Sequence, residues 1–122
     1  MKNRFLFLMA FGIALGGCRP EPDALIGTWT VDKVHVQFDE SRSTPELVKQ
    51  TGEMEKRNTF SISADSVLVF KGIDEQWEEH VNLVNDSVLR CSGRDFGIWS
   101  GERIVTRTDT PLGEVLVVYR KE

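Results

Sequence analysis

Apolar and polar residues alternate along most of the chain from residue 25 onward. The clearest case is the segment 75–84, where one side carries Trp77, Val81 and Leu83 and the other carries Gln76, Glu78, His80 and Asn82. A period of two places successive side chains on opposite faces of a β-strand. Glu79 is an exception, because it falls on the apolar side of this segment. The pattern predicts strands that bury one face each.

Segments of this kind follow one another and are separated by short runs rich in Gly, Asp, Asn and Ser, which favour turns. They cover residues 25–38, 59–63, 66–71, 75–84, 87–92, 95–100, 103–108 and 114–120. Asn85-Asp86 has the composition of a tight hairpin turn. Short strands at regular spacing indicate an all-β fold, and we expect a small antiparallel meander barrel of about eight strands over residues 25–122.

The first predicted strand changes phase along its length. Its apolar residues occupy odd positions at Trp29 and Val31 and then even positions over residues 34–38. A strand cannot change faces in this way without an extra residue. We therefore expect a β-bulge or sharp bend near Asp32-Lys33, which would let one strand reach both halves of a barrel.

One helix is predicted after the first strand. Ser43-Thr44 supplies a hydroxyl cap, Pro45 suits the first turn, and Glu46 lies near the positive end of the helix dipole. The helix would run from Pro45 to about residue 56 and cover one end of the barrel. Gly52 weakens it and its apolar stripe is narrow, so a partly ordered loop is the alternative.

The first residues of the chain have a different character. Lys2 and Arg4 precede an apolar run over residues 5–15, which is too short to span a bilayer as a helix. Leu15-Gly16-Gly17-Cys18 then resembles the lipobox of bacterial lipoproteins, in which the cysteine is lipidated and the chain is cut before it. The resemblance implies a cleaved signal peptide over residues 1–17 and a lipidated Cys18 with a tether over residues 18–24. An ordinary secretory leader is the alternative.

The lipobox resemblance also bears on location and charge. Arg19 stands where an aspartate would be the familiar inner-membrane retention signal of enteric bacteria, so an outer-membrane location in the cell envelope is implied.

Loss of residues 1–17, which include Lys2 and Arg4 and no acid, would change the formal net charge from −4 to −6. An acidic domain argues against nucleic acid as a partner, because that role needs clustered Lys and Arg.

The cysteine content limits the disulfides and thiol chemistry that are possible. With Cys18 lipidated, Cys91 is the only free thiol, so no internal disulfide is expected. We interpret Cys91 as a small buried apolar residue rather than a nucleophile.

Glu78 and His80 share a strand face, which we interpret as solvated rather than catalytic. The two histidines lack the spacing of a zinc site, and we expect no catalytic residue, metal or cofactor.

Four short segments together frame the mature chain. They are Cys18, Leu25-Ile26-Gly27-Thr28-Trp29, Asn85-Asp86-Ser87-Val88 and Tyr119-Arg120-Lys121. In these features the chain resembles the small lipocalin-like (calycin-like) lipoproteins of Bacteroidetes-type bacteria. The resemblance implies that Gly27 and Trp29 close one end of a barrel. It also implies that a basic residue, Arg120 as the best match and Arg107 as the second, packs across the Trp29 indole in a cation–π contact.

Candidate ligand-binding residues come from the aromatic and inward-facing polar positions. Trp99 lies between Gly97 and Gly101, a setting typical of a barrel mouth, and we expect it at the end opposite Trp29. Trp77 is the second aromatic candidate.

Two polar side chains complete the predicted ligand site. Glu79 and Arg90 would point inward and either pair with each other or orient the headgroup of a ligand.

The sequence leaves two functions open. The first is a lipid-anchored, non-catalytic envelope protein that binds a small apolar ligand inside the barrel. The second is a structural or assembly lipoprotein that has a filled core and binds an envelope protein through its outer face. A filled interior around Trp77 and Trp99 would favour the second.

Overall fold

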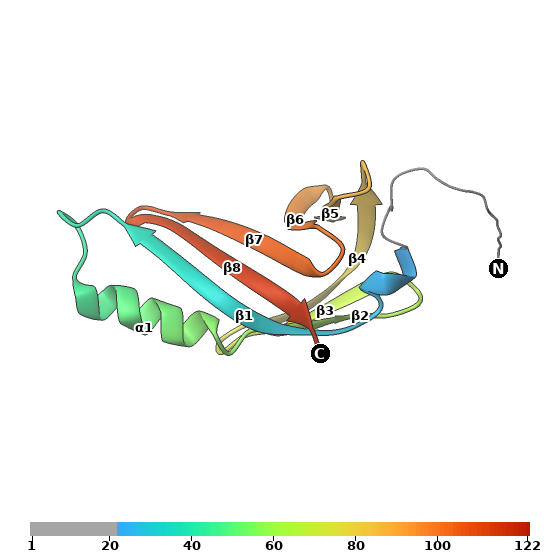
Figure 1. Ribbon diagram of the computed structural model, residues 1–122, viewed down its shortest axis with the longest axis horizontal. Helices are drawn as coiled ribbons and strands as arrows, with labels where there is room; N and C mark the ends of the chain where they lie inside the picture. Colours follow the sequence, from blue (N-terminus) through green and yellow to red (C-terminus); the bar gives the residue numbers. More distant parts are fainter. Residues whose placement is uncertain (1–21) are drawn as a thin grey trace.

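The computed structural model describes residues 22–122, which form a closed antiparallel barrel (Figure 1). Each strand pairs with the next along the chain, and β8 closes onto β1. The strands are β1 (Gly27–Phe38), β2 (Thr59–Ile62), β3 (Val67–Lys71), β4 (Gln76–Val84), β5 (Val88–Cys91), β6 (Arg94–Trp99), β7 (Arg103–Thr110) and β8 (Gly113–Lys121). This arrangement confirms the predicted fold class. The predicted signal peptide, residues 1–17, and Cys18 lie outside the described residues.

Two short helices accompany the barrel. The 3-10 helix η1 (Pro22–Leu25) precedes β1, and α1 (Pro45–Glu55) follows it, as the sequence predicted. The Thr44 hydroxyl caps α1 by accepting a hydrogen bond of 3.2 Å from the Leu47 N–H. No residue of α1 is buried. Among the described residues, no helix is long and apolar enough to cross a membrane.

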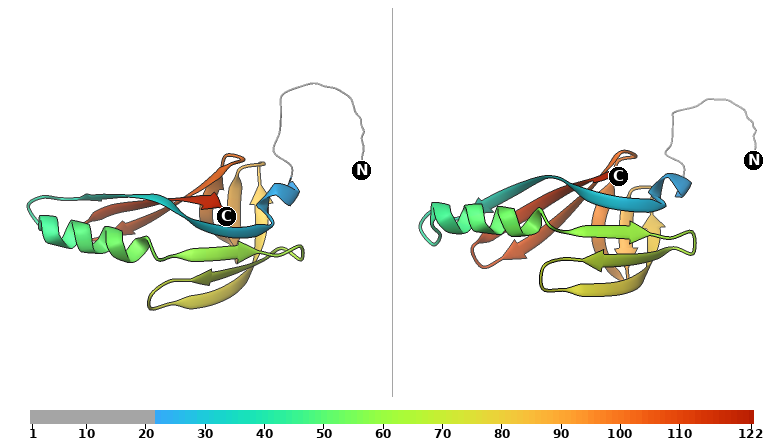
Figure 2. Two further views of the ribbon diagram at one scale, coloured as in Figure 1. Left: turned by 60° about the horizontal axis from the view of Figure 1, so that its bottom comes forward. Right: turned by 90° about the horizontal axis from the view of Figure 1, so that it is seen from below.

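Three strands project beyond the others as an arm. The arm consists of residues 33–38 of β1, 106–110 of β7 and 113–118 of β8, since β2 pairs only with Gly27 to Thr30 and β6 pairs with β7 only at Val105 and Ile104. Figures 1 and 2 show α1 lying along this arm, beside β1. The helix therefore covers the arm rather than entering the barrel core.

The predicted phase change in β1 is a β-bulge. Val31 pairs with Tyr119 on β8 and Lys33 pairs with Val118, so Asp32 is an extra residue without a partner across the ladder. The Asp32 carboxylate accepts a hydrogen bond of 3.1 Å from Arg103 on the barrel exterior. The bulge lets Trp29 and the apolar residues of the arm face inward from one strand.

A second bulge, in β6, was not predicted. Leu89 pairs with Gly97 and Arg90 pairs with Asp95, which leaves Phe96 as the extra residue. The bulge turns Phe96 into the barrel, where its ring meets those of Phe60 and Trp77 edge-on at 5.1 and 5.9 Å between centroids.

Aromatic side chains fill the centre of the barrel. One row crosses four neighbouring strands in register, consisting of Trp29, Phe60, Phe70 and Trp77. Tyr119 packs edge-on against Phe60 from β8, at 4.7 Å between ring centroids. Burial of each such ring stabilises the fold by about 1.5–3 kcal/mol, so this row is a main source of stability.

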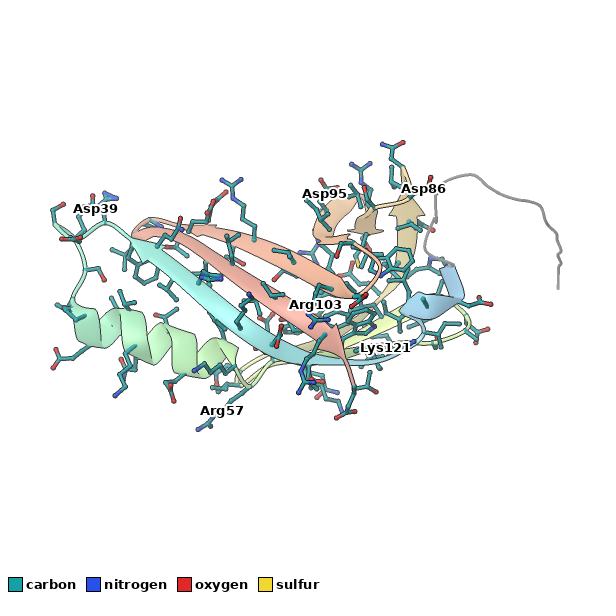
Figure 3. The ribbon with its side chains drawn as sticks, viewed as in Figure 1. Asp39, Arg57, Asp86, Asp95, Arg103 and Lys121 are labelled. Atoms are coloured by element: carbon teal, nitrogen blue, oxygen red, sulfur yellow. The ribbon has the colours of Figure 1, made fainter. Side chains whose placement is uncertain are left out.

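Trp29 closes the end of the barrel where β1 begins, which we call the closed end. Its indole N–H donates a hydrogen bond of 3.0 Å to the carbonyl of Leu25 in η1, and the side chain is fully buried. The Lys121 ammonium donates to the carbonyl of Ala24 at 2.9 Å, which fixes η1 against the last strand (Figure 3). Gly27 has a φ of +137°, and a Cβ there would lie 2.7 Å from the Lys121 side chain.

Arg120 does not cover the Trp29 indole as the family resemblance implied. It pairs with Thr30 across the β1–β8 ladder, and strand alternation places it on the face opposite Trp29 and Tyr119. Its guanidinium lies on the barrel exterior, 3.9 Å from the Asp32 carboxylate. The ring stacked on Trp29 is that of Phe60, at 6.2 Å between centroids.

Candidate functional site

The end of the barrel opposite Trp29 holds a cavity of about 290 Å³, which we call the mouth cavity. Its less polar wall comes from five strands and consists of Phe70, Trp77, Cys91, Phe96, Val117 and Tyr119. Uncharged polar groups are contributed by Asn58, Thr106 and Thr108. The charged groups are Glu55, Glu75, Arg94, Asp95 and Arg107. The cavity therefore combines an aromatic wall with a charged rim.

The aromatic wall is held together by ring contacts. Phe70 and Trp77 stack at 5.3 Å between centroids with 11° between their planes, and Phe96 meets both edge-on. Phe70 is buried, whereas Trp77 and Phe96 are half-buried. An apolar surface thus remains available at the mouth while the deeper part of the barrel is filled.

Arg94 covers the outer side of this wall. Its guanidinium lies 5.6 Å from the centroid of a Trp77 ring and donates a hydrogen bond of 3.0 Å to the Glu79 carboxylate. Hydrogen bonds from Ser92 and then from Arg94 lower the pKa of Glu79, which keeps its carboxylate ionised at neutral pH. The Arg94–Glu79 pair thereby links β6 to β4, the strands on either side of β5.

Tyr119 forms part of the deep wall of the mouth cavity. Burial raises the pKa of its phenol to about 12, and the negative charges of Glu55 and Glu75 act in the same direction. Hydrogen bonding with Asn58 and Thr106 opposes this rise. The phenol therefore stays protonated at neutral pH and can donate or accept a hydrogen bond there.

Cys91 lies in the same wall and is buried, as predicted. Burial raises the pKa of its thiol, and the negative charge of Glu79 adds to the rise. A thiol in this setting stays protonated at neutral pH, which is the state of a packing residue rather than of a nucleophile.

Two of the predicted ligand-binding residues lie elsewhere. Trp99 is the last residue of β6 and belongs to the end of the barrel where β1 begins, so its expected position opposite Trp29 is wrong. It is 2% exposed, and its indole N–H has no hydrogen-bond partner among the described residues. Arg90 faces outward and donates a hydrogen bond of 3.0 Å to Asp95.

The other two predicted residues lie together at the mouth. Trp77 lines the cavity, and Glu79 lies two residues along β4, joined to it through Arg94. Glu79 thus has an arginine partner, but the partner is Arg94 rather than Arg90. Arg94 pairs with the buried Cys91 across the β5–β6 ladder and so lies on the inner face, whereas Arg90 alternates with the buried residues Leu89 and Cys91 and faces outward.

Sequence reasoning missed most of the polar groups of the mouth. Glu55 is the last residue of α1, and Asn58 follows that helix. Glu75 lies in the β3–β4 turn, and Arg107 lies on the arm. These positions are brought together by barrel closure and by the packing of α1 on the arm. The local signal for Glu55, Asn58 and Glu75 is their position at or beside element ends, which an up-and-down barrel brings to the same end; Arg107, inside β7, gives none.

A second cavity of about 180 Å³ adjoins the mouth cavity. The two share Glu55, Asn58 and Glu75, and the second adds Met54, Gly72, Ile73 and Asp74. Met54 and Ile73 are 47% and 44% exposed and give the second cavity its apolar edges. The shared residues therefore lie between an aromatic compartment and a shallower one with apolar edges.

The described residues contain no group of three or more His, Cys, Asp and Glu side chains placed to hold a metal ion. Glu78 and His80, which share the outer face of β4, are both exposed. Comparison with protein-family models, with curated proteins and with solved structures found no match for this chain.

Proposed function

We propose that this protein is a lipid-anchored, non-catalytic binding protein of the cell envelope that holds a small ligand in the mouth cavity. The observation that carries the proposal is the contrast between the two ends of the barrel. The closed end is packed with buried side chains and has a smaller cavity of about 140 Å³ beside η1, whereas the other end has a cavity of about 290 Å³ beside half-buried aromatic rings. Ligand pockets combine an apolar wall with a few convergent polar groups in this way.

The lipid anchor and the envelope location rest on the lipobox sequence ending at Cys18. The lipocalin-like resemblance supports the same proposal, since an up-and-down barrel with one closed end suits the storage of a small molecule. The mixed lining modifies the expected ligand: its apolar part would contact Phe70, Trp77 and Phe96, and a polar part would reach the charged rim.

A second function is favoured by a specific feature of the barrel exterior. Five apolar side chains form one row across β4 to β8, because each pairs with the next in register; they are Val84, Val88, Ile98, Val105 and Val118. Ile98 at the centre of the row is 59% exposed. A contiguous apolar row on a surface suits contact with an envelope protein.

One experiment separates the two functions. Native mass spectrometry of the full-length protein, released from its own membrane in mild detergent, would be run on wild type, Thr108→Trp and Ile98→Lys. Thr108→Trp fills the mouth from an exposed rim position, and Ile98→Lys places a charge in the outer apolar row. We expect a retained small molecule in wild type and Ile98→Lys and its loss in Thr108→Trp.

The opposite pattern would support the assembly function. A co-purifying protein that is lost only in Ile98→Lys would contradict the ligand-binding proposal. A bare protein in all three samples would count against both functions.

A further inference from the structure

Two carboxylates stand where the mouth cavity meets the adjoining cavity. Glu55 ends α1 and Glu75 precedes β4, and both side chains line both cavities. The Glu55 carboxylate accepts a hydrogen bond from the Asn58 amide, which fixes its position at the boundary. Separate elements thus present two acids to the same space.

The basic groups of the mouth cavity do not neutralise these acids. Arg94 is bound to Glu79 at 3.0 Å, and Arg107 lies 2.6 Å from Glu114 and 3.2 Å from Asp109.

The third acid of the mouth cavity is neutralised, since Asp95 is paired with Arg90 at 3.0 Å. Within residues 22–122, no basic side chain forms an ion pair with Glu55 or Glu75. The charge left over at the cavity boundary is therefore negative.

The negative charges of Glu55 and Glu75 also act on Tyr119, inside the cavity. Burial is the main cause of its raised pKa, but Glu55 and Glu75 both contribute to the rise. Both carboxylates therefore act on the deep wall of the cavity and not only on the solvent outside. Glu55 is half-buried and Glu75 is exposed, so a positive group placed between them would gain from both charges at the edge of the cavity.

The aromatic wall suits the carbon part of a cation. The Trp77 indole already has the Arg94 guanidinium over its ring, at 5.6 Å from the centroid, so its environment tolerates positive charge. Asn58, Thr106 and Tyr119 add hydrogen-bonding oxygens near the acids. A cavity of about 290 Å³ limits the guest to a small molecule.

We propose that the mouth cavity binds a small organic amine. Its ammonium group would lie between Glu55 and Glu75, and its carbon skeleton would lie against Phe70, Trp77 and Phe96. This inference rests on the proposed function and names the ligand class of that same site.

The test uses three probes of similar size that differ in charge: phenethylammonium, 2-phenylethanol and 3-phenylpropanoate. Binding to the full-length protein in zwitterionic detergent would be followed through the indole N–H signal of Trp77 by nitrogen-15 NMR. The chain has three tryptophans, and Trp29 and Trp99, buried at the closed end, provide internal references. We expect phenethylammonium to bind at least about tenfold more tightly than 2-phenylethanol.

Substitutions of Glu55 and Glu75 test whether these two carboxylates cause the tighter binding of the amine. Glu55→Gln and Glu75→Gln should each weaken binding of the amine by about threefold to tenfold and leave binding of the alcohol unchanged. Glu53→Gln is the matched control, because Glu53 lies on the same helix, is exposed and pairs with Lys56 at 3.7 Å. It should leave both affinities unchanged.

Two results would overturn the inference. Equal or tighter binding of the alcohol or the carboxylate would show that the ligand class is wrong while ligand binding itself stands. Failure of all three probes to shift the Trp77 signal would also reject the amine. Native mass spectrometry then decides the proposed function separately, because a retained molecule lost in Thr108→Trp would show that the mouth holds a different ligand.

Discussion

Tyr119 belongs both to the aromatic core and to the wall of the mouth cavity. Its ring packs against Phe60 in the aromatic core, and its hydroxyl reaches the mouth cavity among Asn58 and Thr106. The hydroxyl is thus held in a fixed place by the same packing that stabilises the barrel. The raised pKa follows from this position, because burial disfavours the phenolate and the neighbouring acids disfavour it further.

The titration of Tyr119 can be measured directly, since it is the only tyrosine in the chain. Absorbance of tyrosinate near 295 nm should rise with a midpoint at about pH 12 instead of 10. The folded state holds the phenolic proton more tightly than the unfolded state does. The resulting stabilisation is complete below pH 10 and is lost as pH rises from 10 through 12, by roughly 3 kcal/mol in total.

Tyr119→Phe is the control for this effect. Its free energy of unfolding should fall less steeply between pH 9 and pH 12 than that of wild type, because the titrating group is gone. A tyrosinate midpoint near pH 10 in the folded protein would contradict the buried position of the hydroxyl.

At the scale of elements, most of the strands could be predicted because their apolar residues alternate. The helix was predictable from the cap at Thr44 and Pro45, and the β1 bulge from a phase change between Val31 and residue 34. The β6 bulge gave no such signal, because Phe96 and Ile98 share a parity but face opposite sides of the sheet. The errors at Trp99 and Arg90 have other causes: the antiparallel strand order brings the end of β6 to the end where β1 begins, and Arg90 faces outward because it alternates with the buried residues Leu89 and Cys91.

The mouth could be located only in part from sequence. Trp77 and Glu79 were recognised because they share the inward side of one strand with simple alternation. The remaining groups come from loops and ends whose meeting depends on the closure of the barrel and on where α1 lies. Such contacts between residues distant in sequence leave no periodic trace in the chain.

Two glycines in different elements should respond oppositely to the same substitution. A Cβ at Gly52 in α1 would meet nothing within 4 Å, so Gly52→Ala should stabilise the protein by about 0.5–1 kcal/mol through helix propensity. A Cβ at Gly97 in β6 would lie 2.9 Å from the Val105 carbonyl oxygen. Gly97→Ala should therefore destabilise it by about 1–3 kcal/mol.

Denaturant unfolding followed by circular dichroism measures both changes under one set of conditions. Because the two substitutions add the same methyl group, each serves as the control for the other. Destabilisation by Gly52→Ala would show that α1 packs more closely on the arm than the structure indicates.

At the scale of the whole molecule, the two ends of the barrel have different relations to the proposed anchor. The described chain starts with η1 at the closed end, and Pro22 is four residues after Cys18. Four residues of extended chain span at most about 14 Å. A lipidated Cys18 would therefore hold the closed end close to the membrane surface and leave the mouth cavity facing the aqueous side. A ligand would then enter from solution rather than from the bilayer.

This orientation leads to a prediction about the membrane-bound protein. Cysteine would be introduced at Glu102, in the β6–β7 turn of the closed end, or at Thr108 on the rim of the mouth, and labelled with a fluorophore in reconstituted vesicles. Lipids spin-labelled at the headgroup should quench the label of Glu102→Cys several-fold more than that of Thr108→Cys, because quenching requires close approach. Adding Cys18→Ser to each variant should release the protein from vesicles and abolish both effects. Equal quenching at the two positions would show that the barrel lies on its side, and unchanged membrane binding of the Cys18→Ser forms would show that the anchor is not at Cys18.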